Sequence, residues 1–190
     1  MAYRMCSRGA IIAAMATGTL LLPIVGCKSG KKQPNDKNFT TALNTYYSNH
    51  NDCLYSQALK FPYEVPSTDK SDKGPKAMDA LTAAGLLTRD EDKSIKVKRY
   101  ALTPIGTRAT GRFCYGHREV TQVDGFTEPA TVGGHLQSAV SYHYKMLDVP
   151  VWANTDEMKH AFPLLAKALS DQAEGKTTLM RTLDDWEVPE

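Results

Sequence analysis

The feature that most constrains this 190-residue chain is a two-residue alternation between residues 136 and 146. The even positions carry apolar or small side chains, and the odd positions are mostly polar. These even positions are Leu136, Ser138, Val140, Tyr142, Tyr144 and Met146. Because successive side chains of a strand point to opposite faces, the pattern predicts a half-buried β-strand. Such a strand needs neighbouring strands and a layer that covers its apolar face.

The residues before this strand predict that the sheet is antiparallel. Residues 113–123 form a candidate strand, and Asp124-Gly125 is a favoured two-residue hairpin turn. Residues 126–132 return as a strand, which a proline within it confines to an edge position. Gly133-Gly134 then predicts the turn into the alternating strand.

The first half of the chain favours helices and a hairpin. Residues 38–50 carry an apolar stripe at three- and four-residue steps, so they predict a helix, with Asp36 or Asn38 as its N-cap. Pro75 is suited to begin a second helix, and Gly85 to end it. Two short strands, residues 86–88 and 95–102, are expected to follow, with an acidic turn at 90–92 between them. Thr103-Pro104 then predicts an N-cap and a first helical residue.

The last part of the chain predicts two short helices and a strand. Asn154 to Glu157 resembles a capping box, and Pro163 begins a further helical stretch that we expect to close near Gly175. Residues 177–183 form the last strand candidate, and Trp186 with Val188 is expected to pack onto the body.

Together these segments predict an α+β fold in a single domain, residues 38–190. Residues 38–110 hold an N-terminal helix and a helix-plus-wing unit, and residues 111–190 hold an antiparallel β-sheet with one or two packed helices. The helix-plus-wing unit is named for a resemblance. Residues 81–88, the predicted hairpin and residues 100–106 are similar to the last helix and wing of winged-helix proteins.

The resemblance covers about Pro75 to Gly106, and the chain departs from the DNA-binding members of that family. A proline-containing segment and a polar loop stand where those members have an additional helix. The acidic residues 90–92 would also face DNA phosphates unfavourably. We therefore interpret this unit as structural or protein-binding, with no nucleic acid as a partner.

The first thirty residues have the features of an export signal. Arg4 and Arg8 are followed by an apolar and small-residue run from Gly9 to Gly26, and no acidic residue precedes Asp36. The run ends in Leu-Pro-Ile-Val-Gly-Cys27, which resembles the lipobox of bacterial lipoproteins. The resemblance implies that residues 1–26 are removed as a signal peptide and that Cys27 is acylated. An uncleaved membrane anchor is the alternative.

The residues after Cys27 bear on location and tether. In Gram-negative lipoproteins an Asp at the next position favours inner-membrane retention, and here Lys28 and Ser29 follow, so the resemblance implies an outer-membrane protein facing the periplasm. Residues 28–37 contain no large apolar side chain, so we expect residues 27–37 to form a lipidated flexible linker.

The chain has 23 Lys and Arg and 21 Asp and Glu, and losing Arg4 and Arg8 leaves 21 of each. A mature chain without net charge does not favour nucleic-acid binding.

Two cysteines would remain for the exported domain, Cys53 and Cys114. In an oxidising compartment they predict a disulfide bond. Two separate buried thiols, or one reactive thiol, are the alternatives.

No recognisable catalytic motif accompanies this organisation, so no catalytic residue and no cofactor is predicted. We select His117, His143 and Trp152 as candidate binding residues. A metal site formed by the two histidines and Glu119 is a further interpretation, and we favour the simpler one, in which these side chains are solvated. The preferred hypothesis is a non-enzymatic accessory or binding module of the cell envelope, with an envelope protein as its partner. The alternative is a small envelope enzyme of the hydrolase type, whose site forms only in three dimensions.

Overall fold

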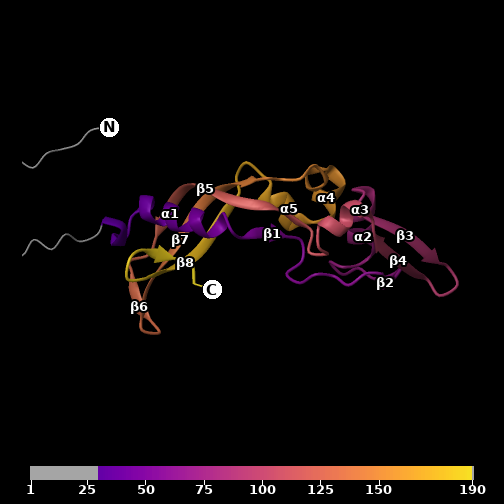
Figure 1. Cartoon of the computed structure of the whole chain (residues 1–190), viewed down its shortest axis with the longest axis horizontal. Coiled ribbons are helices and arrows are strands. Elements are labelled where there is room, and N and C mark those ends of the chain that lie inside the picture. The colour runs from indigo at the N-terminus through magenta and orange to yellow at the C-terminus, as the bar shows by residue number, and fades with distance from the viewer. Residues whose placement is uncertain (1–29, 190) are drawn as a thin grey trace, which may run out of the picture.

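The computed structural model describes residues 30–189, and it shows an elongated α+β protein (Figure 1). The predicted signal peptide and Cys27 lie outside the described residues. Its helices are η1 (Gly30–Lys32), α1 (Asp36–Tyr47), α2 (Pro75–Ala83), α3 (Pro104–Arg108), η2 (Val151–Asn154), α4 (Asp156–Ala161) and α5 (Pro163–Ala168). Its strands are β1 (Asn51–Cys53), β2 (Tyr63–Pro66), β3 (Leu87–Asp92), β4 (Val97–Leu102), β5 (Cys114–Phe126), β6 (Ala130–Val132), β7 (His135–Leu147), β8 (Glu174–Arg181) and β9 (Trp186–Glu187). Within the described part, no helix is both long and apolar enough to cross a membrane.

The predicted alternating strand is confirmed as β7, the centre of the larger sheet. This sheet has the order β1-β5-β7-β8-β9, and every pairing in it is antiparallel. β6 also pairs with β7, and Thr127 between β5 and β6 bonds to Ala139 of β7. β5 and β6 therefore follow the same edge of β7, and the three strands form one long hairpin that turns at Gly133 and Gly134, both with positive φ.

The first hydrophobic core lies between this sheet and α1, which covers the face to which the even residues of β7 point. Val140 and Tyr142 of β7 are fully buried there with Phe39 and Leu43 of α1. The hydroxyls of Tyr47, Tyr142 and Thr177 bond to one another within this core. Trp186 is 2% exposed and packs against Phe39, so the predicted docking of the C-terminal segment is confirmed.

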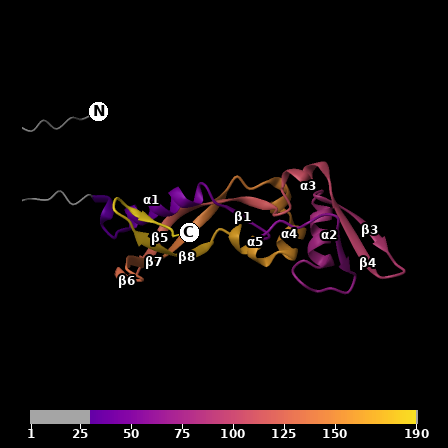
Figure 2. The same ribbon diagram turned by 60° about the horizontal axis from the view of Figure 1, so that its bottom comes forward.

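The second core lies at the other end of the molecule, where α2, α4 and α5 pack near the small sheet β2-β4-β3 (Figure 2). Met78, Leu81 and Tyr100 are fully buried in it. As predicted, Pro75 begins α2, Gly85 follows its end with positive φ, and Thr103 caps α3. The predicted hairpin exists as β3 and β4, while the resemblance to winged-helix proteins stays a prediction.

Two predicted turns are wrong because pairing with a neighbouring strand keeps the chain extended. Asp124-Gly125 is part of β5, where a register shift between Val123 and Gly125 marks a bulge instead of a hairpin turn. The acidic residues 90–92 belong to β3 and not to a turn. Asp90 and Glu91 lie opposite Arg99 and Lys98 of β4, and such cross-strand charge pairs stabilise a continued ladder.

Several predicted helix ends are shifted. α1 is capped by Asn35, whose Oδ1 accepts a hydrogen bond from the Asn38 backbone at 2.9 Å, and not by Asp36 or Asn38. Thr155, not Asn154, caps α4. α5 ends at Ala168, and Gly175 lies inside β8.

The predicted flexible linker is also shorter than expected. The side-chain amide of Asn38 donates to the carbonyls of Gly30 at 2.7 Å and Gln33 at 2.9 Å. These bonds join η1 to the start of α1, so the described part of the linker is attached to the body from Gly30 onward.

The predicted disulfide between Cys53 and Cys114 is present, and it crosslinks β1 to β5 over 61 residues. A loop of this length implies a stabilisation of about 4 kcal/mol through the lost entropy of the unfolded chain. We therefore expect the double variant Cys53→Ser/Cys114→Ser to unfold at lower urea concentration, with up to about 4 kcal/mol lost. Adding a reductant to the unchanged protein should reproduce the effect, and unfolding curves that do not respond to either change would contradict it.

Candidate binding hollow at the waist

The two cores meet at a narrow junction, which we call the waist. It consists of β1, residues 114–118 of β5, residues 144–147 of β7 and the segment 148–152 that follows. Met146 of β7 packs against both cores. The long hairpin therefore continues from one core into the next, and the disulfide holds β1 against it.

A charged pair reinforces the waist beside the disulfide. The Arg118 guanidinium contacts both carboxylate oxygens of Asp52, at 2.7 and 3.2 Å. It also lies over the rings of Tyr47 and Tyr144, 5.2 and 4.7 Å from their centres. Burial alone would lower the pKa of Arg118, but the hydrogen bond and charge of Asp52 outweigh it and raise that pKa. Burial raises the pKa of Tyr47 to about 12, which keeps its hydroxyl neutral.

On one side of the waist, a hollow of about 410 Å³ opens between α3 and the segment after β7; we call it the Trp152 hollow. Its lining residues are Asn51, Leu86, Ile105, Arg108, Ala109, Cys114, Gly116, Asp148, Pro150 and Trp152. Ile105 is 56% exposed, and Val151, next to Trp152 in the chain, is 88% exposed. Arg108 and Asp148 add one positive and one negative side chain to this apolar lining. Such a surface is typical of a site that receives an apolar side chain of a partner protein.

The chain path that forms the hollow depends on a glycine. Gly116 has φ +115°, a conformation that other residues rarely adopt. A Cβ atom added there would lie 2.2 Å from the carbonyl oxygen of Leu147. Because Gly116 has no side chain, the backbone of β5 lies directly against Leu147, where β7 ends. Asp148, with φ +55°, then turns the chain toward Trp152.

Of the three predicted binding residues, Trp152 lines this hollow. His117 is not in the lining, but its Nδ1 lies 3.5 Å from Oδ2 of Asp148, which is. His143 lies elsewhere. His117 is opposite Leu147 while His143 is opposite Gln122, so the two histidines are separated by four residues along β7, roughly 13 Å.

His143 is instead held by carboxylates of the neighbouring strands. Its Nδ1 lies 2.7 Å from Asp124 of β5, and its Nε2 lies 3.4 Å from Glu174 of β8. Glu119, the predicted third metal ligand, pairs with Lys145 at 2.6 Å. Among residues 30–189, no three His, Cys, Asp or Glu side chains are grouped so that they could hold a metal ion.

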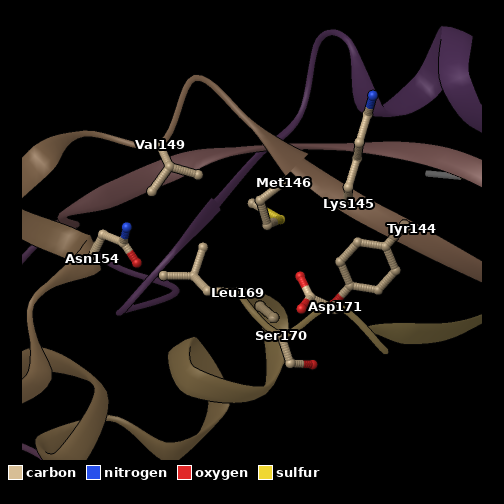
Figure 3. A pocket seen from close by; sticks show the side chains of 9 residues that line it. Tyr144, Lys145, Met146, Val149, Asn154, Leu169, Ser170 and Asp171 are labelled. Atoms are coloured by element: carbon tan, nitrogen blue, oxygen red, sulfur yellow. The ribbon is translucent and has the colours of Figure 1, made fainter.

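A second hollow of about 320 Å³ lies on another side of the waist, between the end of β7 and the loop after α5 (Figure 3). Tyr144 and Met146 of β7 and Asn154, Leu169 and Asp171 line it. In Figure 3 Lys145 extends away from the other labelled side chains, as expected for the next residue of a strand. This hollow lacks the exposed apolar rim of the Trp152 hollow.

The sequence did not indicate Ile105, Arg108 or Asp148 as site residues. The Thr103-Pro104 signal predicted the short helix that carries the first two, but not that this helix would face the end of β7. Comparison of the chain with protein-family models, curated proteins and solved structures gives no match.

Gly116→Ala tests the close approach beneath the hollow. We expect it to lower the free energy of unfolding by at least about 2 kcal/mol, because the new Cβ meets backbone and φ is unfavourable. The matched control is Gly133→Ala, also at positive φ but with no atom within 4 Å of the added Cβ. It should cost about 1 kcal/mol. Equal losses in urea unfolding would show that the approach at Gly116 is not as tight as described.

The raised pKa of Tyr47 predicts a loss of stability at high pH. Below pH 10 the hydroxyl is neutral in both the folded and the unfolded chain, so its contribution is fully present. Between pH 10 and about 12 only the unfolded chain releases this proton, so the free energy of unfolding falls by up to about 1.4 kcal/mol per pH unit for this group. Urea unfolding from pH 8 to 11 should show a shallower fall for Tyr47→Phe. An unchanged slope would refute the assignment.

Proposed function

We propose that this protein is a membrane-anchored bacterial lipoprotein that acts as a non-enzymatic binding module of the cell envelope. The lipobox-like sequence that ends at Cys27 supports the anchor, and Lys28 and Ser29 favour the outer membrane facing the periplasm. The disulfide between Cys53 and Cys114 is consistent with an oxidising compartment.

The observation that carries the binding role is the Trp152 hollow with its exposed apolar rim. Exposed apolar side chains around a concave surface are typical of protein interaction sites, and an aromatic residue commonly anchors them. Arg108 and Asp148, both in the lining, supply opposite charges that can orient a partner segment. The partner that fits is another envelope protein which places an apolar side chain between Ile105 and Trp152.

The covalent and ionic ties at the waist support the same role. The disulfide and the Asp52–Arg118 pair join β1 to β5 beside the hollow, whose lining includes Asn51 of β1 and Cys114 of β5. A preformed site loses less conformational entropy on binding than a flexible one.

The hydrolase alternative requires a nucleophile, a base and an orienting group side by side. The best-placed base in the described part, His143, is paired at one nitrogen with Asp124 and faces Glu174 at the other. Both imidazole nitrogens of His143 therefore face carboxylates, and we retain the binding module as the conclusion.

Site-specific photocrosslinking in intact cells tests the proposal. A photoreactive amino acid at Val151 should give one discrete adduct with a second protein, because this position borders the hollow. The control is the same amino acid at Ile95, which is 65% exposed on the β3–β4 hairpin, away from the waist. Adding Trp152→Ala should abolish the adduct at 151. No adduct at 151, or equal adducts at 151 and 95, would contradict a binding role for the hollow.

A further inference from the structure

The turn of the long hairpin lies at the end of the molecule farthest from the second core (Figures 1 and 2). Two large apolar side chains are exposed near this turn. Leu183, in the turn between β8 and β9, is 86% exposed, and Val132, at the end of β6, is 56% exposed. The hairpin turn and the β8–β9 turn border one open hollow of about 620 Å³. We call this surface the hairpin-turn end.

The described chain begins at the same end. Gly30 is fixed there by Asn38 at the start of α1. The first turn of α1 also contacts β5 and β9 near this end. The centre of the Phe39 ring lies 4.8 Å from that of Phe126 in β5 and 5.0 Å from that of Trp186 in β9.

The proposed lipid attachment point is very close to this end in the sequence. Cys27 precedes Gly30 by three residues, which span at most roughly 11 Å when fully extended. A lipid on Cys27 therefore holds the hairpin-turn end against the membrane surface. A longer flexible linker would have left the orientation free, but Asn38 attaches the chain to the body from Gly30 onward.

We propose that the hairpin-turn end inserts Leu183 and Val132 into the headgroup and acyl boundary of the membrane that holds the Cys27 lipid, so that the molecule stands on that membrane end-on. This inference rests on the proposed lipidation. Apolar side chains at the interface add to the acyl chains as a second membrane-binding signal.

Charged and apolar side chains are both present at this end. Lys32, Lys37 and Arg181 are offset by Asp36, Asp184 and Glu187. In the sequence, Lys28 and Lys31 add two positive charges beside the proposed lipid. Phosphatidylcholine vesicles therefore isolate the apolar contribution, because they carry no net charge that would attract these lysines. The end-on orientation also directs the Trp152 hollow away from the lipid, toward the compartment where a protein partner would be met.

The test uses the mature lipoprotein, purified with its native modification and reconstituted into phosphatidylcholine vesicles. An environment-sensitive fluorophore is attached to Leu183→Cys and, as a matched control, to Leu164→Cys. Leu164 is 81% exposed on α5, which belongs to the second core and lies away from the hairpin-turn end, so both probes start in water. Brominated lipids then quench only probes that reach the bilayer.

We expect a blue-shifted emission and at least a twofold quenching by brominated lipid at position 183, and neither at 164. A protein that floats with the vesicles but shows equal, unquenched signals at both positions would overturn the insertion and leave the lipidated module intact. A protein that does not float with the vesicles would overturn the lipidation, and the insertion with it. Val132→Cys gives an independent second reading, since it lies on another loop of the same end.

Discussion

The structure depends on one long hairpin, in which β5 and β6 run beside β7 for nearly its whole length. The alternation of β7 places its even side chains under α1, and this burial fixes the register, because a slip of one residue would turn them all to the other face. The open end of the hairpin continues into the second core through Phe113, Tyr115 and Met146. The hairpin thereby joins the two cores, and its turn forms one end of the molecule.

The waist is the point at which this arrangement needs the most support, because few elements cross it. The Cys53–Cys114 disulfide joins β1 to the hairpin covalently, and Asp52 with Arg118 joins them by charge beside it. Both ties lie beside the Trp152 hollow, because Asn51 of β1 and Cys114 of β5 are in its lining. Trp152 supplies the aromatic side chain of that lining.

The sequence predicted features that depend on neighbouring residues, and it failed where distant residues decide. The alternation of β7, the Gly133-Gly134 turn, Pro75 and Thr103 all act within a few positions, and the structure confirms them. Asp124-Gly125 has the composition of a turn, but pairing with β7 keeps it in a strand as a bulge. The sequence indicated Trp152, but the hollow also joins residues near 51, 105 and 116, which no local pattern could have placed beside it.

In the proposed arrangement, a lipid anchor at one end of the hairpin holds the Trp152 hollow at the waist above the membrane. This arrangement depends on the acylation of Cys27, which decides which end faces the membrane. Intact-mass spectrometry of the protein extracted from native membranes tests this claim most directly. We predict a chain that starts at Cys27 and carries a diacylglyceryl thioether with an acylated amino group. A chain that retains residues 1–26 with an unmodified thiol at Cys27 would contradict it.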